Sequence, residues 1–339
     1  MSKPSVVMVA LMVAPWLAAE NADADPVAPI RGAPNPEDLV QLPGTPWVVV
    51  SAMRSKDHPG ALLAVDARAG RAAVSFYAGP RGFAPHGIAV RPLGGGRFEL
   101  LVVDHGGGEA IDRLTLHVVD GRPPVVSSAR RIPLPPGTSA NGVAPLPDGG
   151  LVMTSMFDPR DRRFVARLAA REATGGVWRW SSRSGWRAIA RPRLSGANGI
   201  AVDAGGTNVF VSEWAARRLW RIPLAGGEAT FTTTSFLPDN LRWTSGGELL
   251  VAGQTATPGD LFGCQDGARR CPMGFVVARV DPKTLEVRPV LGGDERAFAA
   301  SGFGGATVAL EVGPQIWVGS FAGDRIARFA APAADDARR

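Results

Sequence analysis

Polar side chains whose oxygen or nitrogen atoms could hold a metal ion or move a proton recur along this chain of 339 residues. Each one lies just before an apolar run. The six positions, called the anchor residues below, are Glu37, His86, Asn141, Asn198, Asp239 and Thr307, and Asn240 follows Asp239 directly. If they converge, their two carboxylates and three amide oxygens would form a cage of hard oxygen ligands, which suits calcium.

The residue types argue against other metals at this site. Zinc would need more His or Cys ligands, and magnesium would use fewer protein ligands. A single Asn-Gly or Asp-Asn pair would indicate only a turn. Because polar anchors recur in five consecutive units, we predict a shared calcium site. Its predicted ligands are Glu37, Asn141, Asn198, Asp239 and Asn240.

Short strands are the elements that would position these residues. The chain is 45% hydrophobic and 20% charged, with 42 Gly and 29 Pro, which excludes collagen, coiled coils and disordered tails. Apolar runs rich in Val, Ile, Leu and Trp alternate with Gly, Pro and Asp turns, a pattern typical of all-β proteins. Examples are Trp47–Ala52, Leu100–Val103, Leu151–Thr154, Val209–Glu213, Leu249–Ala252 and Ile316–Ser320. The segment Asp161–Ala173 is predicted to form a short helix inserted between strands.

The spacing of the anchor residues predicts the architecture. Successive anchors are 49, 55, 57, 41 and 68 residues apart. A period near fifty built of short strands indicates a β-propeller, in which one position of every unit faces a common axis. Six units predict a six-bladed β-propeller over residues 30–332, without WD or kelch signatures. A β-sandwich with a second domain is the structural alternative.

The N-terminal residues 1–24 have the composition of a secretory signal peptide. Lys3 precedes the apolar run Val6–Ala19, and Ala22-Asp23-Ala24 provides a small-residue cleavage site. We therefore expect a secreted or periplasmic protein whose mature form has no stable membrane span. In an oxidising compartment Cys264 and Cys271 favour a local disulfide.

The net charge of +6 comes almost entirely from arginine. These arginines are scattered, and no block of five or six basic residues occurs, so nucleic-acid binding has little support.

At the anchor residues the chain resembles the serum paraoxonase/arylesterase family, within the wider group of gluconolactonases and senescence marker proteins. The similar pieces run in order across roughly residues 35–330. They include Glu37-Asp38-Leu39, Pro85-His86-Gly87-Ile88, Val102-Val103-Asp104-His105, Asn141-Gly142-Val143-Ala144, Ala197-Asn198-Gly199-Ile200, Asp239-Asn240-Leu241 and Thr307-Val308-Ala309. The resemblance implies a six-bladed propeller with calcium in its central tunnel and hydrolysis of lactones and aryl esters.

The resemblance also assigns roles to single residues. It makes Glu37, Asn141, Asn198, Asp239 and Asn240 the ligands of the catalytic calcium, and His86 and His105 the histidine pair above it. Asp38 and the carbonyl of Ile88 match two ligands of a second, structural calcium. The third ligand of that ion would be an Asp after Asn141, where this chain has Gly142.

Two histidines on one rim near a metal favour acid–base chemistry, and His105 follows the next strand of the unit that begins at His86. Ser155 and Ser212 lack a nucleophile elbow, which argues against a serine hydrolase. Met156, Phe157 and Trp214 are candidates for the pocket wall.

The functional hypothesis is a calcium-dependent hydrolase of lactones or aryl esters, with His86 activating water and His105 orienting it or relaying the proton. One alternative is a sugar-lactone hydrolase of the gluconolactonase kind, with a polar, arginine-lined pocket. Others are a non-catalytic propeller that binds a ligand or a protein, and a condensing enzyme like strictosidine synthase. The partner expected is a small lactone or ester. The sequence does not indicate an oligomeric state.

Overall fold

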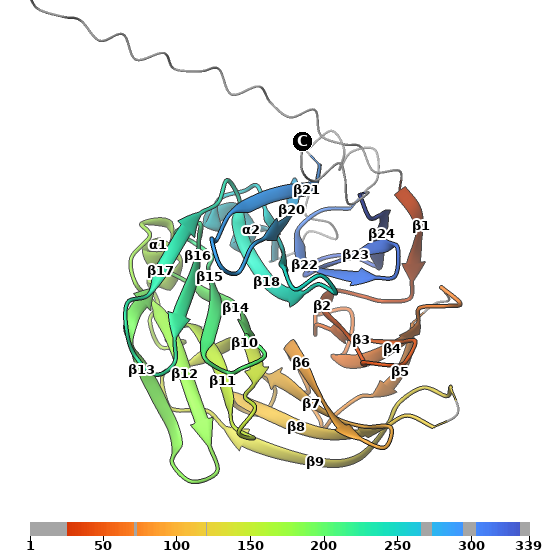
Figure 1. Cartoon of the computed structure of the whole chain (residues 1–339). Helices are drawn as coiled ribbons and strands as arrows, with labels where there is room; N and C mark the ends of the chain where they lie inside the picture. The colour runs from red at the N-terminus through yellow and green to blue at the C-terminus, as the bar shows by residue number, and fades with distance from the viewer. Residues whose placement is uncertain (1–25, 71–72, 120, 266–272, 294–302, 333–339) are drawn as a thin grey trace, which may run out of the picture.

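The computed structural model describes residues 26–70, 73–119, 121–265, 273–293 and 303–332. Strands in these residues form six antiparallel four-stranded sheets, arranged as blades around a central axis (Figure 1). The fold is a six-bladed β-propeller, as the anchor spacing predicted, and the sandwich alternative is wrong.

Each blade is described from its innermost to its outermost strand. Blade 1 contains β2 (Pro36–Gln41), β3 (Trp47–Ala52), β4 (Ala61–Asp66) and β5 (Val74–Tyr77). Blade 2 contains β6 (Pro85–Gly94), β7 (Arg97–Asp104), β8 (Ala110–His117) and β9 (Val125–Pro133). Blade 3 contains β10 (Ser139–Pro145), β11 (Leu151–Phe157), β12 (Gly175–Ser181) and β13 (Gly185–Leu194).

The other three blades follow the same order. Blade 4 contains β14 (Ala197–Val202), β15 (Asn208–Glu213), β16 (Arg218–Pro223) and β17 (Thr230–Thr233). Blade 5 contains β18 (Leu237–Trp243), β19 (Leu249–Gln254), β20 (Phe275–Val280) and β21 (Val287–Gly293). Blade 6 contains β22 (Ala306–Val312), β23 (Gln315–Ser320), β24 (Arg325–Ala330) and, outermost, β1 (Pro26–Arg31).

The ring is closed by strand β1, which comes from the other end of the chain and pairs antiparallel with β24. In that register Ile30 lies opposite Ile326. Ile30 is 1% exposed and belongs to the same apolar cluster as Trp317 and Ile326. The sequence analysis did not identify this closing strand.

Apolar side chains fill the space between neighbouring blades. One cluster joins blades 6 and 1 through Trp317 and Leu39, and another joins blades 1 and 2 through Val49 and Leu100. Equivalent clusters lie between the remaining neighbours. The alternating strand pattern therefore becomes a series of inter-blade cores that hold the inner strands around the axis.

Two short helices lie at one end of the axis. Helix α1 (Phe164–Ala169) falls inside the segment predicted to be helical, whereas α2 (Pro258–Gln265) was not predicted. The Phe164 and Phe262 rings meet edge to face, with centroids 5.3 Å apart. Among the described residues, neither helix is long or apolar enough to cross a membrane.

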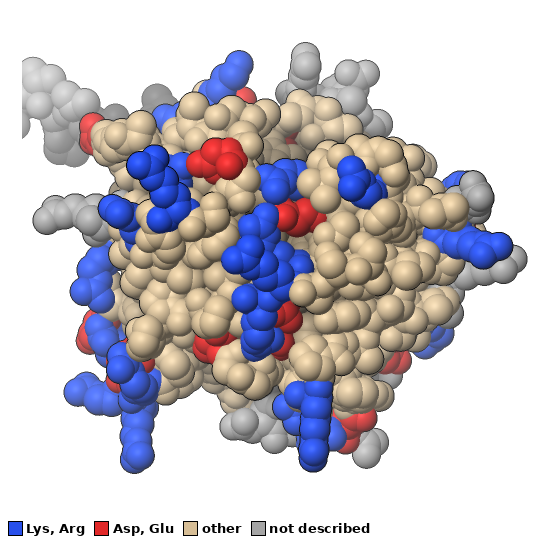
Figure 2. Space-filling view, turned by 90° about the horizontal axis from the view of Figure 1, so that it is seen from below, with Lys and Arg blue, Asp and Glu red and all other residues tan. Residues whose placement is uncertain are grey.

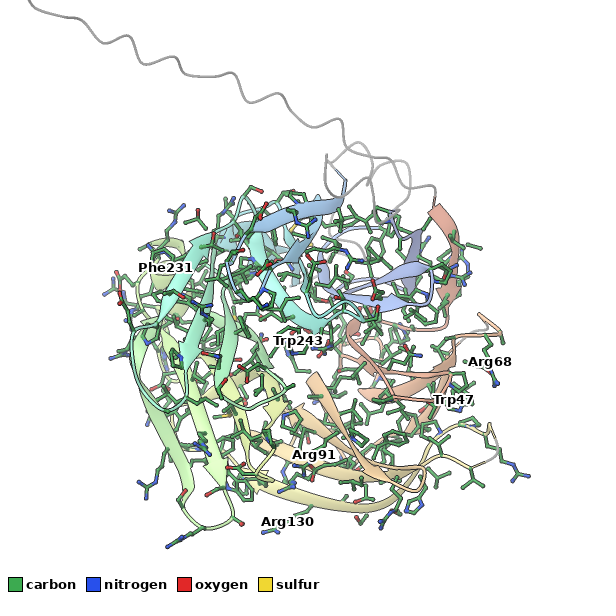
Figure 3. All side chains as sticks on the ribbon, in the orientation of Figure 1. Trp47, Arg68, Arg91, Arg130, Phe231 and Trp243 are labelled. Carbon is green, nitrogen blue, oxygen red and sulfur yellow. The ribbon has the colours of Figure 1, made fainter. Side chains whose placement is uncertain are left out.

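Arginine side chains stud the outer surface of the wheel. On the side shown in Figure 2 several basic side chains form a stripe flanked by acidic ones, and Arg130 points outward on this side (Figure 3). Arg131 bridges Asp104 and Asp112 within blade 2, with its Nη1 2.6 Å from an Asp104 carboxylate oxygen. Some of the positive charge is therefore compensated locally.

Two sequence predictions fall outside the described residues. Residues 1–24 are not among them, so the signal peptide stays a prediction. Cys264 lies near the end of α2, but Cys271 belongs to the segment 266–272, which the structure does not describe. The Cys264–Cys271 disulfide therefore also stays a prediction.

We expect Ile30→Ala to destabilise the whole propeller, because it leaves a cavity in the core of the blade that closes the ring. Replacing a fully buried Ile by Ala lowers the free energy of unfolding by about 2–5 kcal/mol. Denaturant unfolding measures this loss. Arg31→Ala, at an exposed position of the same strand, should change stability by less than about 0.5 kcal/mol. Equal effects of the two substitutions would contradict a stabilising role for β1.

Candidate metal centre

A β-bulge interrupts the innermost strand of every blade at its anchor residue. The register shifts lie between Pro36 and Asp38, Pro85 and Ile88, Ala140 and Val143, Ala197 and Ile200, Pro238 and Leu241, and Ala306 and Val308. A bulge leaves its extra residue out of the ladder and re-aims its side chain. The six bulges thus present the six anchor side chains to one cavity.

Glycines next to the anchors allow the blades to approach one another at the axis. A Cβ on Gly87 would lie 2.2 Å from the Asn141 carbonyl oxygen, and one on Gly199 would lie 2.3 Å from the Asp239 carbonyl oxygen. The glycines that follow His86 and Asn198 are therefore needed for close packing between blades.

Hydroxyl groups fasten the anchor backbones of neighbouring blades. Ser212 Oγ donates to the Asp239 carbonyl at 2.6 Å, and Thr307 Oγ1 donates to the Glu37 carbonyl at 2.6 Å. Thr307, the sixth anchor, thus ties blade 6 to blade 1. Thr154 makes the equivalent bond to the Asn198 carbonyl. These bonds fix the anchor positions relative to one another.

The structure brings the predicted metal ligands together at the floor of a cavity of about 220 Å³. Glu37, Asn141, Asn198 and Asp239 line it, and Asn240 is joined to Glu37 by a bond of 2.9 Å from its Nδ2 to Glu37 Oε1. All five side chains are buried. Their convergence is what a shared site requires, while their metal-binding role remains a prediction.

Three buried oxygen atoms in this set have no hydrogen-bond donor: Glu37 Oε2, Asn141 Oδ1 and Asn198 Oδ1. Leaving a buried polar atom unpaired costs about 1–3 kcal/mol. Three such atoms from three blades fit the carboxylate and amide ligands that calcium prefers. Among the described residues no three His, Cys, Asp or Glu side chains are grouped to hold a metal, so binding here would depend on the amide oxygens.

The electrostatics of the cavity also fit a cation. Burial raises the pKa of Glu37 well above its usual range, and the negative charges of Asp38 and Asp239 raise it further. Burial raises the pKa of Asp239 to about 7, opposed by hydrogen bonds from Gln254 and Asn198. A divalent cation would favour the charged form of both carboxylates.

Asp239 is held by Gln254, which the sequence analysis did not assign, and Gln254 is held in turn by Trp214, a predicted wall residue. Gln254 Nε2 donates to Asp239 Oδ2 at 2.9 Å, and Trp214 Nε1 donates to Gln254 Oε1 at 3.0 Å. Gln254 lies at the end of β19 and is fully buried. A lone Gln at the end of an apolar strand gave no signal in the sequence.

The two predicted histidines are in contact beside the ligand set. His86 Nδ1 and His105 Nε2 are 3.1 Å apart, and the rings meet edge to face. His86 Nε2 lies 3.3 Å from Asn141 Nδ2 and 3.4 Å from Glu37 Oε1. The pair therefore connects directly to the predicted metal ligands.

Glu109 extends this pair into a chain of three groups. His105 Nδ1 lies 2.8 Å from Glu109 Oε1, and the Ala140 amide also donates to Glu109 at 3.3 Å. A network in which Asn141 donates to His86 Nε2 assigns the ring protons: His86 Nδ1–H donates to His105, and His105 Nδ1–H donates to Glu109. The sequence analysis missed Glu109, whose signal was an acid four residues after His105 across a glycine turn.

His86 is electrically neutral in this environment. Burial and then the neighbouring His105 lower the pKa of His86 to about 3. Its ring nitrogen facing the ligand set is thus unprotonated and accepts a hydrogen bond at neutral pH.

The cavity walls are apolar. Met156, Phe157 and Trp214, the wall candidates from the sequence, do line it. Residues that the sequence analysis missed complete the wall: Met53, Leu261, Phe262 and Phe321. Leu261 and Phe262 come from α2, the unpredicted helix. Within the described part of the chain, no arginine lines this cavity.

Comparison with known proteins supports the fold. No family model matches the chain, and no curated protein matches its sequence. Among solved structures, a luciferin-regenerating enzyme is similar with a TM-score of 0.57 and 13% identity over 91% of this chain and 96% of that chain. A putative gluconolactonase has a TM-score of 0.55 and 17% identity, over 92% of this chain and 93% of that chain. The calcium-binding protein regucalcin from Agrobacterium tumefaciens has a TM-score of 0.53 and 15% identity, over 90% of this chain and 91% of that chain. At these identities the likeness establishes the shared propeller fold.

Proposed function

We propose that the protein is a calcium-dependent hydrolase of apolar lactones and aryl esters. One observation carries the proposal: three donorless buried oxygens lie beside the His86–His105–Glu109 chain at the floor of a small apolar cavity. Fold neighbours that include a putative gluconolactonase and a calcium-binding regucalcin lend it support.

Glu37, Asn141, Asn198, Asp239 and Asn240 would hold the ion. When bound, calcium supplies a Lewis acid for an ester carbonyl and its developing oxyanion. Gln254 orients Asp239, and Asn240 orients Glu37, through the bonds at 2.9 Å. The bulges and the inter-blade hydroxyl bonds keep these oxygens in place without substrate, which is the preorganisation that catalysis requires.

The histidine chain would activate water. His86 Nε2 accepts a proton from a water molecule as its oxygen attacks the carbonyl carbon, and His86 Nδ1–H passes a proton to His105 Nε2. Glu109 holds His105 Nδ1–H and stabilises the positive charge that forms on that ring, as the third member of a triad does. The proton then returns to the alkoxide leaving group when the acyl–oxygen bond breaks, so both histidines are neutral again after each turnover.

The lining selects the substrate class. Methionine and aromatic side chains favour apolar acyl or aryl groups, whereas a sugar lactone presents hydroxyls that need polar partners. The arginine-lined pocket expected of a gluconolactonase-like enzyme does not match the side chains described here. We therefore place acyl lactones and aryl esters ahead of sugar lactones.

We expect Asn198→Ala to abolish most of the hydrolysis, because it removes one of the three donorless oxygens. A chelator should have the same effect on the wild type. Added calcium should restore the activity lost to the chelator but not the activity lost to the substitution. The measurement is turnover of a long-chain acyl lactone, gluconolactone and phenyl acetate side by side. Asn208→Ala, at an asparagine outside the cavity, should leave turnover unchanged. Chelator-insensitive turnover that survives Asn198→Ala would reject the mechanism.

We expect His86→Gln to lower kcat by about 10²–10⁴-fold, the usual contribution of a general base. Glu109→Gln should lower kcat less, with KM nearly unchanged, because Glu109 acts through His105 and does not line the cavity. Steady-state kinetics on the best substrate of the panel separates the two effects. His117→Gln, at the end of β8 and outside the cavity, serves as the control. A Glu109→Gln variant with wild-type kcat would remove Glu109 from the mechanism.

Phe262→Ala should lower kcat/KM for long acyl lactones more than for small esters, because it removes an apolar wall that small substrates do not fill. We expect a loss of about 10-fold for the long substrates, equivalent to about 1.4 kcal/mol of lost apolar contact. The ratio of kcat/KM values across a chain-length series measures it. Phe231→Ala, at a half-exposed phenylalanine on blade 4, should leave the ratio unchanged. A uniform loss for all lengths would place the acyl chain elsewhere.

A further inference from the structure

The predicted metal ligands form a layer across the axis, called the ligand layer below. Arg242 on β18 extends its guanidinium between blades on the side of this layer away from the small cavity. Its neighbour Trp243 lies close to the axis in Figure 3. Arg242 lines a second cavity of about 650 Å³, which includes residues of all six innermost strands. Glu37, Asn141, Asn198 and Asp239 line the smaller cavity instead. Arg242 thus lies on the side of the ligand layer away from the proposed active site.

The guanidinium contacts three different carbonyl or carboxylate groups of blades 1 and 2. Arg242 Nε donates to the Leu39 carbonyl at 2.7 Å, and Nη2 donates to the Ile88 carbonyl at 2.9 Å. Nη2 also makes a close ion pair with Asp38 Oδ1. The Asp38 side chain is 1% exposed and the Arg242 side chain 12%. One arginine of blade 5 therefore contacts blades 1 and 2, neither of which is next to blade 5 in the ring.

These partners are the groups that the family resemblance assigns to a second calcium, Asp38 and the Ile88 carbonyl. Both Asp38 oxygens are already occupied: Oδ1 accepts from the Leu39 amide at 2.9 Å and Oδ2 from the Ile88 amide at 2.8 Å. Neither oxygen is among the donorless atoms, in contrast to Glu37, Asn141 and Asn198. The ligands available for a second ion are therefore satisfied without one.

The position of the third expected ligand is also closed. A Cβ on Gly142 would lie 3.0 Å from the Asn198 carbonyl oxygen and 3.0 Å from the Ile200 amide nitrogen. Those atoms belong to the inner strand of the next blade, which cannot move away cheaply. The chain thus lacks the third ligand, a carboxylate after Asn141, that the resemblance assigns to a second calcium site.

We infer that the Arg242 guanidinium takes the place of a second, structural calcium ion, so that this side of the propeller carries a permanent cation of its own. The cationic guanidinium balances the buried carboxylate and satisfies backbone carbonyls, as a metal ion would, but it cannot be lost to a chelator. The cross-link between blades 5, 1 and 2 is then independent of calcium. This inference concerns a site separate from the proposed catalytic ligands.

The first test counts calcium ions per chain by elemental analysis after equilibration with micromolar calcium. We expect one ion in the wild type and none in Asn198→Ala. Two ions in the wild type, or one that persists in Asn198→Ala, would overturn the inference. A wild type without any ion would contradict the calcium dependence of the proposed function and leave the inference standing, so the two failures are distinguishable.

The second test measures the thermal unfolding midpoint of Arg242→Ala. We expect a loss on the order of 5–10 °C in chelator, because the substitution leaves the buried Asp38 charge unpaired. Millimolar calcium should recover part of the loss and add a second ion to the count, since the vacated carboxylate and carbonyls can then accept a metal. Asp38→Asn in the same background should abolish the recovery.

Arg279→Ala is the matched control. Its side chain is 16% exposed and pairs with Glu248 and Glu311, and it does not contact Asp38. Its loss of midpoint should be smaller and should not respond to calcium. If Arg242→Ala does not fold, Arg242→Lys, which keeps the charge but not the planar fork, should fold with a lowered midpoint and bind one ion. An Arg242→Ala midpoint equal to that of the wild type, or a loss unaffected by calcium, would overturn the inference.

Discussion

The structure depends on one constraint: buried oxygen atoms from separate blades must meet at the axis without repelling the blades apart. Bulges aim the anchor side chains inward, and glycines such as Gly87 and Gly199 let the adjacent backbones come close enough. Hydroxyl groups on Thr154, Ser212 and Thr307 then satisfy anchor carbonyls. Among the predicted ligands, the atoms left without a donor are Glu37 Oε2, Asn141 Oδ1 and Asn198 Oδ1, and these define where a cation would be stabilised.

The two ends of the axis solve the same electrostatic problem in different ways. At the end with the small cavity, Glu37 and Asp239 are buried, and burial raises the pKa of both. At the other end, Asp38 is paired with Arg242, and its two oxygens also accept hydrogen bonds from backbone amides. The arrangement around Glu37 and Asp239 leaves room for an exchangeable ligand. The arrangement around Asp38 fills its space with the protein's own atoms, which suits a structural role.

Much of the fold and the candidate ligand set could be predicted because repetition amplifies weak local signals. Asn141-Gly142 alone reads as a turn, but the same kind of position in successive units specifies a common axis. Glu109, Gln254 and Arg242 could not be found in this way, since each occurs in one blade only and acquires its partner through tertiary contact. Helix α2 was missed because its eight residues lie in a long interval without strong helical periodicity.

Strand β1 was missed for a related reason, because a single short strand carries no sign of its partner. Its pairing with β24 joins segments 300 residues apart, as the bond from Arg328 Nε to the Ala28 carbonyl shows. During synthesis, blade 6 cannot be completed until Arg325–Ala330 has left the ribosome. Contacts of such long range slow folding, because loop-closure entropy must be overcome before they form. The nascent chain therefore remains an open arc in which β1 has no partner until β24 has been made, and in that interval it depends most on protection from aggregation.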